Sequence, residues 1–278
     1  MRKKYKIIFL SLAQNCASTL KNYFNFLEKF PKSFKIKIII AENNSKDKTR
    51  EIIDNYSKTN KDVTLLKTDF LNSIDERILR ITRGRDFLQK YIIKYNLNSD
   101  FICIIDLDDV IKKKINFKKF IKVLRHLKKN KNKLNGISVK TNPYYYDILA
   151  LKCHKFKTPN VLKIQREKNI LSAYSIRKKY IYSLQKKLNS EKKLYTISSF
   201  NGLCVYNYKD FIKGNYFYGE NNKKRVNFTE HIKFNSSLNN LNGKFIQISD
   251  QLFLSTPKEH LPASSFINFW FNRIFLRK

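Results

Sequence analysis

Short apolar runs alternate with stretches of helical spacing through the first half of the chain. Strand-like runs occupy residues 6–12, 35–41, 62–68 and 101–110, and the last of these is apolar almost until its end. Helical patterns lie between them, in AQNCASTLKNYFNFLEKF, TREIIDNYSK and ERILRITRGRDFLQKYIIKY. Strands that alternate with helices predict an α/β fold with a mostly parallel, doubly wound sheet.

The second half of the chain is less regular. INFKKFIKVLRHLKK and EHIKFNSSLNNL have helical patterns, GISVKTN, FNGLCVYN and GKFIQISDQLFL read as strands, and LQKKLNSEKK reads as a solvated loop or helix end. We expect residues 1–255 to form one domain and residues 256–278 to form an amphipathic, basic and aromatic tail. This tail, with Phe266, Trp270 and Ile274 at helical spacing, could either lie in a membrane interface or pack back onto the domain.

The chain carries a formal net charge of +35, which predicts attraction to a polyanion such as nucleic acid, an acidic bilayer surface or a phosphorylated substrate. Compositional drift in an AT-rich genome would raise Lys, Asn and Ile together and is the alternative explanation. The cysteines, Cys16, Cys103, Cys153 and Cys204, form no CxxC pair, so a reducing, cytoplasmic setting fits best. No window has the ~18 continuous apolar residues that span a bilayer, so we expect a protein that is soluble or peripheral at the inner face of a membrane.

Carboxylates follow the fourth predicted strand directly, as Asp106, Asp108 and Asp109. In an open α/β sheet, ligands bind beyond the carboxyl ends of the strands, where Glu42 also lies after the second strand. Carboxylates spaced D-x-D can direct two oxygens toward one hard divalent cation. Capping of the next helix, or ion pairing with the lysines at 112–114, is the structural alternative.

A series of motifs extends this pattern along most of the chain: SLAQNCASTL, AENNSKDKT, RITRGRDFL, IIDLDDV, NPYYYDILALK, FNGLCVYN and TEHIKFN. In order and spacing, over residues 6–250, the series resembles the GT-A glycosyltransferases, specifically the family-2-like group and relatives of the fungal capsule-associated mannosyltransferases. The resemblance implies a Rossmann-like GT-A fold with an irregular acceptor-binding C-terminal part. It also implies a nucleotide-sugar-dependent hexosyltransferase with Mn²⁺ or Mg²⁺ as cofactor, acting in surface polysaccharide synthesis.

The resemblance also implies a role for individual residues. The donor nucleotide would be bound by Glu42, Asn44, Arg80, Arg85 and Asp106, and the metal by Asp106, Asp108 and His231. Arginines suit bidentate phosphate contacts, although Arg80 and Arg85 could equally belong to a solvated helix face.

The same resemblance places the sugar and acceptor near Tyr145, Asp147, Asn201 and Gly202. An aromatic ring beside a carboxylate suits a sugar, whereas core packing is the alternative for Tyr144 and Tyr146. Glu230 and His231 would be catalytic, with Glu230 deprotonating an acceptor hydroxyl and His231 completing the metal shell or assisting as base. A helix-start acid with an unrelated imidazole is the alternative for this pair.

Two classes of function therefore follow. The first is a transferase that takes a nucleotide-sugar donor and a glycan or lipid-linked acceptor, near an anionic membrane surface. The second is a basic nucleic-acid-binding protein, suggested by the net charge and by the 22 Phe and 16 Tyr residues among the basic ones. The chain shows no recognisable nucleic-acid-binding motif, and its acids gather at strand ends where a polyanion would be repelled, so the first is expected.

Overall fold

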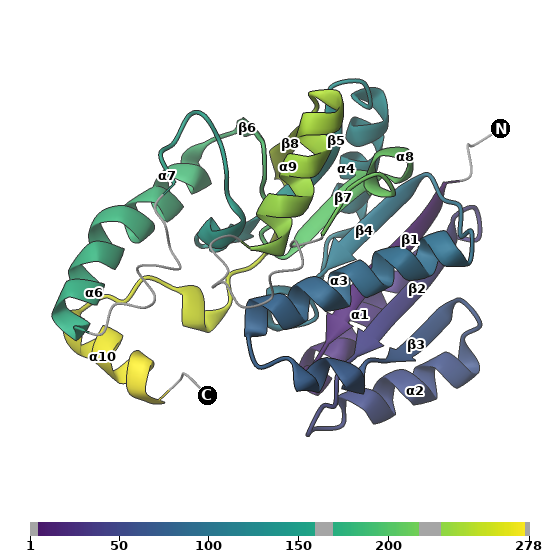
Figure 1. Cartoon of the computed structure of the whole chain (residues 1–278), viewed down its shortest axis with the longest axis horizontal. Coiled ribbons are helices and arrows are strands. Elements are labelled where there is room, and N and C mark those ends of the chain that lie inside the picture. The colour runs from purple at the N-terminus through teal and green to yellow at the C-terminus, as the bar shows by residue number, and fades with distance from the viewer. Residues whose placement is uncertain (1–4, 159–168, 217–228, 276–278) are drawn as a thin grey trace.

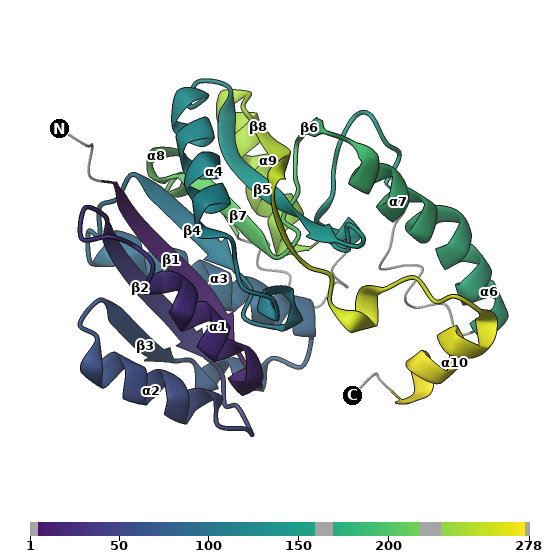
Figure 2. The same cartoon turned by 180° about the vertical axis from the view of Figure 1, so that it is seen from behind.

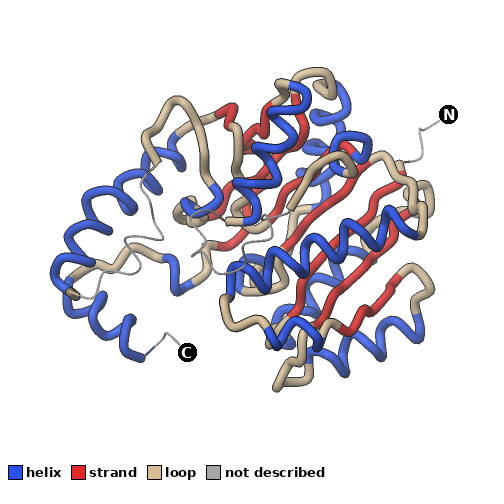
Figure 3. The backbone as a smooth tube through the Cα atoms, viewed as in Figure 1, coloured by secondary structure: helices blue, strands red, loops and turns tan. Residues whose placement is uncertain are grey.

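The apolar runs of the sequence become strands of one 8-stranded sheet, which crosses the middle of the molecule (Figure 1, Figure 3). The structure, a computed structural model, describes residues 5–158, 169–216 and 229–275. Its strands are β1 (Lys6–Ala13), β2 (Lys35–Glu42), β3 (Val63–Lys67), β4 (Phe101–Ile105), β5 (Leu134–Asn142), β6 (Lys193–Thr196), β7 (Leu203–Asn207) and β8 (Phe245–Ser255).

The strand order of the sheet is β3-β2-β1-β4-β7-β5-β8-β6. Neighbours in the first four positions are parallel, as are β5 and β8, whereas β7 runs against both β4 and β5 and β6 runs against β8. The chain moves outward from β1 to β3 and then returns to place β4 on the other side of β1. The carboxyl ends of β1 and β4 therefore flank the point at which a doubly wound sheet binds its ligand.

Helices cover both faces of this sheet. The α-helices are α1 (Ala17–Leu27), α2 (Thr49–Thr59), α3 (Arg77–Lys94), α4 (Phe117–Lys129), α6 (Ile170–Ile176), α7 (Ser183–Ser190), α8 (Tyr208–Phe211), α9 (Glu230–Asn242) and α10 (Phe266–Phe275). Helical segments of other types are η1 (Asp69–Ser73), η2 (Asp109–Ile111), η3 (Ile148–Ala150), η4 (Arg177–Tyr182) and η5 (Lys258–His260). Side-chain capping marks the start of α3, where the Glu76 carboxylate accepts the backbone N–H of Leu79 at 2.6 Å.

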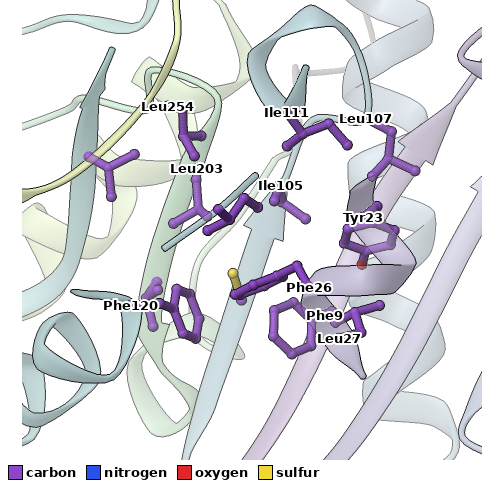
Figure 4. Close-up of a cluster of buried hydrophobic side chains, with 14 of the residues drawn as sticks. Phe9, Tyr23, Phe26, Leu27, Ile105, Leu107, Ile111, Phe120, Leu203 and Leu254 are labelled. Carbon is purple, nitrogen blue, oxygen red and sulfur yellow. The ribbon is translucent and has the colours of Figure 1, made fainter. Parts of the chain in front are cut away.

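Two hydrophobic layers hold the sheet between its helices. Helices α1, α2 and α4 pack on one face, where Phe9, Phe26 and Phe120 form an aromatic cluster (Figure 2, Figure 4). Helices α3 and α9 pack on the other face around buried aromatic residues such as Tyr206 and Phe234. Because strand residues alternate between the two faces, the central strands are apolar on both sides, as their sequence indicated.

The structure confirms the α/β fold with a mostly parallel sheet covered on both faces. The segment read as a solvated loop or helix end is the end of a helix, in which Leu184 and Leu188 of α7 turn inward to a third core cluster. The structure corrects one boundary of the first half: the run at 101–110 stops being a strand at Ile105, so its acidic residues lie beyond β4.

The tail begins where β8 ends. It passes through η5 and forms α10, which lies beside α6 at the end of the molecule opposite α2 (Figure 1, Figure 2). The tail residues Leu276, Arg277 and Lys278, and the side chains of Arg273, Ile274 and Phe275, fall outside what the structure describes. Across the described part of the chain, no helix combines the length and the apolar character that a bilayer crossing requires. The division into residues 1–255 and 256–278 stays a prediction.

Candidate active site

Asp106 lies one residue beyond β4, at the carboxyl edge of the sheet. Its backbone N–H donates to the carbonyl of Gly202 at 2.9 Å, and its Oδ1 accepts a hydrogen bond from Nη2 of Arg85 at 2.6 Å. Arg85 comes from the middle of α3 and is almost fully buried. Burial raises the pKa of Asp106, and the Arg85 guanidinium opposes part of that effect. Asp106 is thus held by both its backbone and its side chain.

Asp108 lies two residues further on and differs from Asp106 in its surroundings. Its Oδ1 accepts the backbone N–H of Val110 at 3.1 Å and so caps η2, which fulfils the capping alternative. Partial burial of the carboxyl group, and secondly the charge of Asp106, raise its pKa to about 7. The side chain still reaches solvent, which softens the effect. Asp108 is therefore a carboxyl with crowded neighbours and an open side.

The Asn201–Gly202 turn before β7 connects this edge to the Tyr146–Asp147 segment. The Asn201 Oδ1 accepts the backbone N–H groups of Tyr146 at 3.0 Å and Asp147 at 3.1 Å, while its Nδ2 donates to the Val139 carbonyl at 3.1 Å. Both turn residues have left-handed backbone angles, with φ of 60° and 84°. One turn therefore fixes Asp106 through a carbonyl and Asp147 through an amide side chain.

Asp147 is the third carboxyl at the edge. Its Oδ1 accepts the backbone N–H of Ala150 at 3.1 Å and begins η3. Burial, and secondly the charge of Asp106, raise its pKa to about 6, and the nearby His260 imidazole opposes the shift. His260 belongs to η5 in the tail and lies against the Tyr146 ring, with 4.9 Å between ring centroids. The tail thus returns to the edge of the sheet.

Glu230 and His231 begin α9, on the sheet face that α3 also covers, and both side chains are buried. Burial raises the pKa of Glu230 to about 7, although the Arg85 charge opposes the shift. The His231 ring stacks on Phe200 with centroids 3.8 Å apart, and its Nε2 lies 3.4 Å from Oε1 of Glu230. Burial, and secondly the Arg85 charge, lower the pKa of His231 well below its ordinary value, so the imidazole is neutral.

These carboxyl groups act on one another electrostatically. The charge of Asp106 contributes to the raised pKa values of Asp108, Asp147 and Glu230. Arg85 is the cation that offsets Asp106 and Glu230, and its side chain also lies 5.5 Å from the Phe200 ring centroid. Within the described ranges, no three His, Cys, Asp or Glu side chains are placed to hold one metal ion. The edge therefore carries more acid than its basic partners neutralise.

Two of the predicted nucleotide-binding residues, Glu42 and Asn44, are linked through Arg50 and Asp69 at the ends of β2 and β3. The fully buried Glu42 forms an ion pair with Arg50 and accepts the backbone N–H of Ser45 at 2.7 Å. Arg50 also pairs with Asp69, whose Oδ1 accepts the backbone N–H of Asn44 at 3.1 Å. This network shapes the AENNSKDKT turn and so gives Glu42 a structural task, whether or not it also meets a nucleotide.

The structure separates two other predicted residues from the carboxyl group cluster by their contacts. Arg80 donates from Nη1 to the carbonyl of Ile74 at 3.1 Å, which supports the start of α3. Tyr145 is fully buried in the hydrophobic cluster of α7 and η3, so it packs in the core. Its neighbour Tyr146 lies beside Asp106, so the aromatic side chain near the carboxyl groups is one residue further along the chain than the sequence indicated.

The sequence patterns did not indicate Tyr146 or His260 as members of the site. Tyr146 is one of three consecutive tyrosines, and only the hydrogen bond from its backbone to Asn201 decides which ring meets the carboxylates. His260 stands in no motif, and its separation from Asp147 along the chain hides their proximity. The chain has only 4 histidines, and this scarcity was the one feature of the sequence that could have drawn attention to His260.

Comparisons with known proteins gave structural similarity alone. No protein-family model matches the sequence, and no curated protein matches it either. A solved structure of S. aureus TarS (residues 1–349) aligns with 12% identity and a TM-score of 0.49, covering 90% of this chain and 60% of that chain. The mannosyltransferase PcManGT from Pyrobaculum calidifontis, solved with GDP-Man and Mn²⁺, aligns with 10% identity and a TM-score of 0.49, covering 98% of this chain and 61% of that one.

A complex of TarS with UDP-GlcNAc aligns similarly, with 12% identity and a TM-score of 0.48. This chain spans 61% of the length of that TarS chain. Because the sequence identities and TM-scores are this low, the functional interpretation depends on the residues of this chain.

Proposed function

We propose that this protein is a glycosyltransferase that uses a divalent cation to transfer a sugar from a nucleotide-sugar donor to a hydroxyl of a glycan or lipid-linked acceptor. One observation carries the proposal: several carboxyl groups with raised pKa values converge at the carboxyl end of β4, around the Arg85–Asp106 pair. Such an excess of acid at a ligand-binding edge suits a site completed by a cation and a phosphorylated donor.

The residues present fit a divalent cation by their chemistry. Asp108 offers hard oxygen ligands on the open side of the site, and burial and the Asp106 charge raise its pKa, so a bound cation would relieve the repulsion between the two carboxyl groups. Asp106 would add an oxygen not engaged by Arg85. The cation, Mn²⁺ or Mg²⁺, would supply neutralisation of the donor diphosphate.

Glu230 is the proposed general base. A carboxylate acts best as a base when its pKa lies near the working pH, and burial brings that of Glu230 to about 7. The neutral His231 ring beside it would orient the carboxylate, a role that its stacking on Phe200 favours over metal binding. Glu230 would take the proton from the acceptor hydroxyl as that oxygen bonds to the sugar and the nucleoside diphosphate leaves.

The remaining predicted residues divide between donor and acceptor. Arg80 and the Glu42–Asn44 turn would border the donor nucleotide, because they lie at the same edge of the sheet as Asp106. Asp147 would accept hydrogen bonds from sugar hydroxyls, and Tyr146 would offer its ring to the sugar face. Asn201 and Gly202 act by positioning these groups, since their contacts are with the chain itself.

The experiment is a thermal-shift screen of nucleoside diphosphates and nucleotide sugars, each with and without Mn²⁺. Specific binding to the folded state raises the melting temperature by mass action, so one nucleotide should stabilise the wild type strongly when the cation is present. The same screen on Asp108→Asn should lose the cation-dependent part. Stabilisation by random DNA in place of any nucleotide, with or without Mn²⁺, would contradict the proposal and favour nucleic-acid binding.

A further inference from the structure

One face of α10 presents large apolar side chains to solvent. Ile267 is 73% exposed, Trp270 41% and Phe271 53%. Residues spaced three and four apart share a face of a helix, so these side chains form one apolar strip. An exposed Trp beside an exposed Ile is costly in water and is a feature of surfaces that bind something.

The opposite face of α10 fixes the helix to the protein. Phe269 is buried against Tyr174 of α6, with ring centroids 5.4 Å apart, and the Arg177 guanidinium lies 5.7 Å from the Phe269 ring centroid. Phe266 also contacts Tyr174, at 5.7 Å between centroids. The helix is therefore packed against the protein on one side and open to solvent on the other.

The surroundings of this strip are basic. Segment 169–190 contains no Asp or Glu and includes Arg177, Lys178, Lys179, Lys186 and Lys187. Segment 261–278 has no acidic residue either. Leu171, on α6, adds a further exposed aliphatic side chain. Both helices lie at the end of the molecule away from α2, so one flat surface could meet them together (Figure 1, Figure 2).

We propose that the outward face of α10, with the basic residues of η4 and α7, docks this protein on an anionic membrane surface. Trp side chains favour the boundary between headgroups and acyl chains, and basic residues beside an apolar strip meet the lipid phosphates. A helix of 10 residues lies in that interface and does not cross it. A second copy of the chain would bring two basic, acid-free segments together, which disfavours self-association on this face.

This inference does not depend on the proposed function, and its test needs no activity assay. Trp270 is the only tryptophan of the chain, so its fluorescence reports on this face alone. Full-length protein is titrated with phosphatidylcholine vesicles that contain or lack phosphatidylglycerol. Binding should shift Trp270 emission to shorter wavelength and sediment the protein with the anionic vesicles, and added salt should weaken both.

The variant Ile267→Glu tests the apolar strip, and Leu241→Glu is its matched control. Leu241 is 64% exposed on α9, so the control introduces the same charge change at a similarly exposed apolar side chain. We expect Ile267→Glu to lower vesicle binding by about tenfold or more, since it places a charge where an aliphatic side chain would be buried in the bilayer. Leu241→Glu should bind within about twofold of the wild type.

Any of several outcomes would overturn the inference: an unchanged emission spectrum with anionic vesicles, equal binding to vesicles without phosphatidylglycerol, equal effects of the two variants, or a dimer that Ile267→Glu converts to a monomer. An emission shift with oligonucleotides but not with vesicles would also overturn it. Because Ile267 is exposed, circular dichroism melting should give the same transition for all three proteins, which keeps loss of binding distinct from loss of fold.

Discussion

The Arg85 guanidinium reaches from the interior of α3 to the carboxyl end of β4 and donates a hydrogen bond to Asp106 at 2.6 Å. The pair separates two carboxyl groups that are neighbours in the sequence, because Asp106 has a buried cation and Asp108 has none that the structure describes within hydrogen-bond distance. Asp106 is thereby fixed in place, whereas the described hydrogen bond of the Asp108 side chain is to the backbone N–H of Val110.

The first prediction concerns this ion pair. Arg85→Met leaves a partly buried carboxylate without its cation and should lower the free energy of unfolding by about 3 kcal/mol. The double variant Arg85→Met/Asp106→Asn should recover much of that loss, because residue 106 then carries no charge that needs the Arg85 cation. Urea unfolding of the two single variants and the double variant measures the coupling. If the losses simply add, the pair does not stabilise the fold.

The second prediction concerns pH. The folded pKa values of Asp108, Asp147 and Glu230 lie at about 7, 6 and 7, above their ordinary values. Between about pH 4 and pH 7 the folded state then binds more protons than the unfolded state, so stability falls as the pH rises through that window. Urea unfolding across this range should show the decline, and Mn²⁺ at the upper end should reverse part of it by binding the ionised form.

The third prediction isolates Asp108. Asp108→Asn removes the carboxylate but keeps its shape, so it should abolish cation-dependent turnover and leave the protein as stable as the wild type, or more so, near neutral pH. The pH dependence of its unfolding should also be shallower than that of the wild type. Turnover close to that of the wild type, in the presence of a chelator, would rule out Asp108 as a metal ligand.

The fourth prediction assigns the base. Glu230→Gln should reduce turnover by ~10²–10⁴-fold while donor binding, measured by calorimetry, stays unchanged. Glu51→Gln, the same chemical change on the exposed surface of α2, is the matched control and should keep full activity. A Glu230→Gln protein that loses donor affinity and turnover together would instead place this carboxylate in donor binding.

The fifth prediction compares two glycines with left-handed backbone angles. A Cβ at Gly202, with φ of 84°, would lie 2.9 Å from Cγ1 of Val110 and 3.2 Å from the Tyr146 hydroxyl, whereas one at Gly243, with φ of 67°, would meet nothing within 4 Å. Both Ala variants should lose about 1 kcal/mol of stability from backbone strain. Only Gly202→Ala should also lose activity, since it displaces the turn that holds Asp106.

The sequence predicted the first half of the fold well, because a parallel sheet buried on both faces has a strong hydrophobic pattern. The helix from Arg77 to Lys94 and the placement of Asp106 and Asp108 beyond β4 both follow from that pattern. The reversed direction of β7 could not be predicted, since an apolar strand of five residues fits either direction.

The sequence named candidate site residues only where they stand in motifs. It named Asp147 and Glu230 from their motifs, but it could not show that both sense the charge of Asp106. It placed the aromatic contact at Tyr145, whereas the bond from the Tyr146 backbone to Asn201 turns the next ring toward the carboxylates. His260 reaches the site from η5 through the path of the tail, which no local pattern encodes.

Strand β7 has a mechanical consequence for the whole molecule. It is hydrogen-bonded to β4 along one side and to β5 along the other, so it joins the parallel half-sheet of β3, β2, β1 and β4 to the half formed by β5, β8 and β6. The two halves therefore cannot swing about a hinge without breaking backbone pairs in the middle of the sheet. Any closure over a ligand would therefore have to come from segments at the periphery of the sheet, and among the described ones η5 carries His260 on a short turn between β8 and α10.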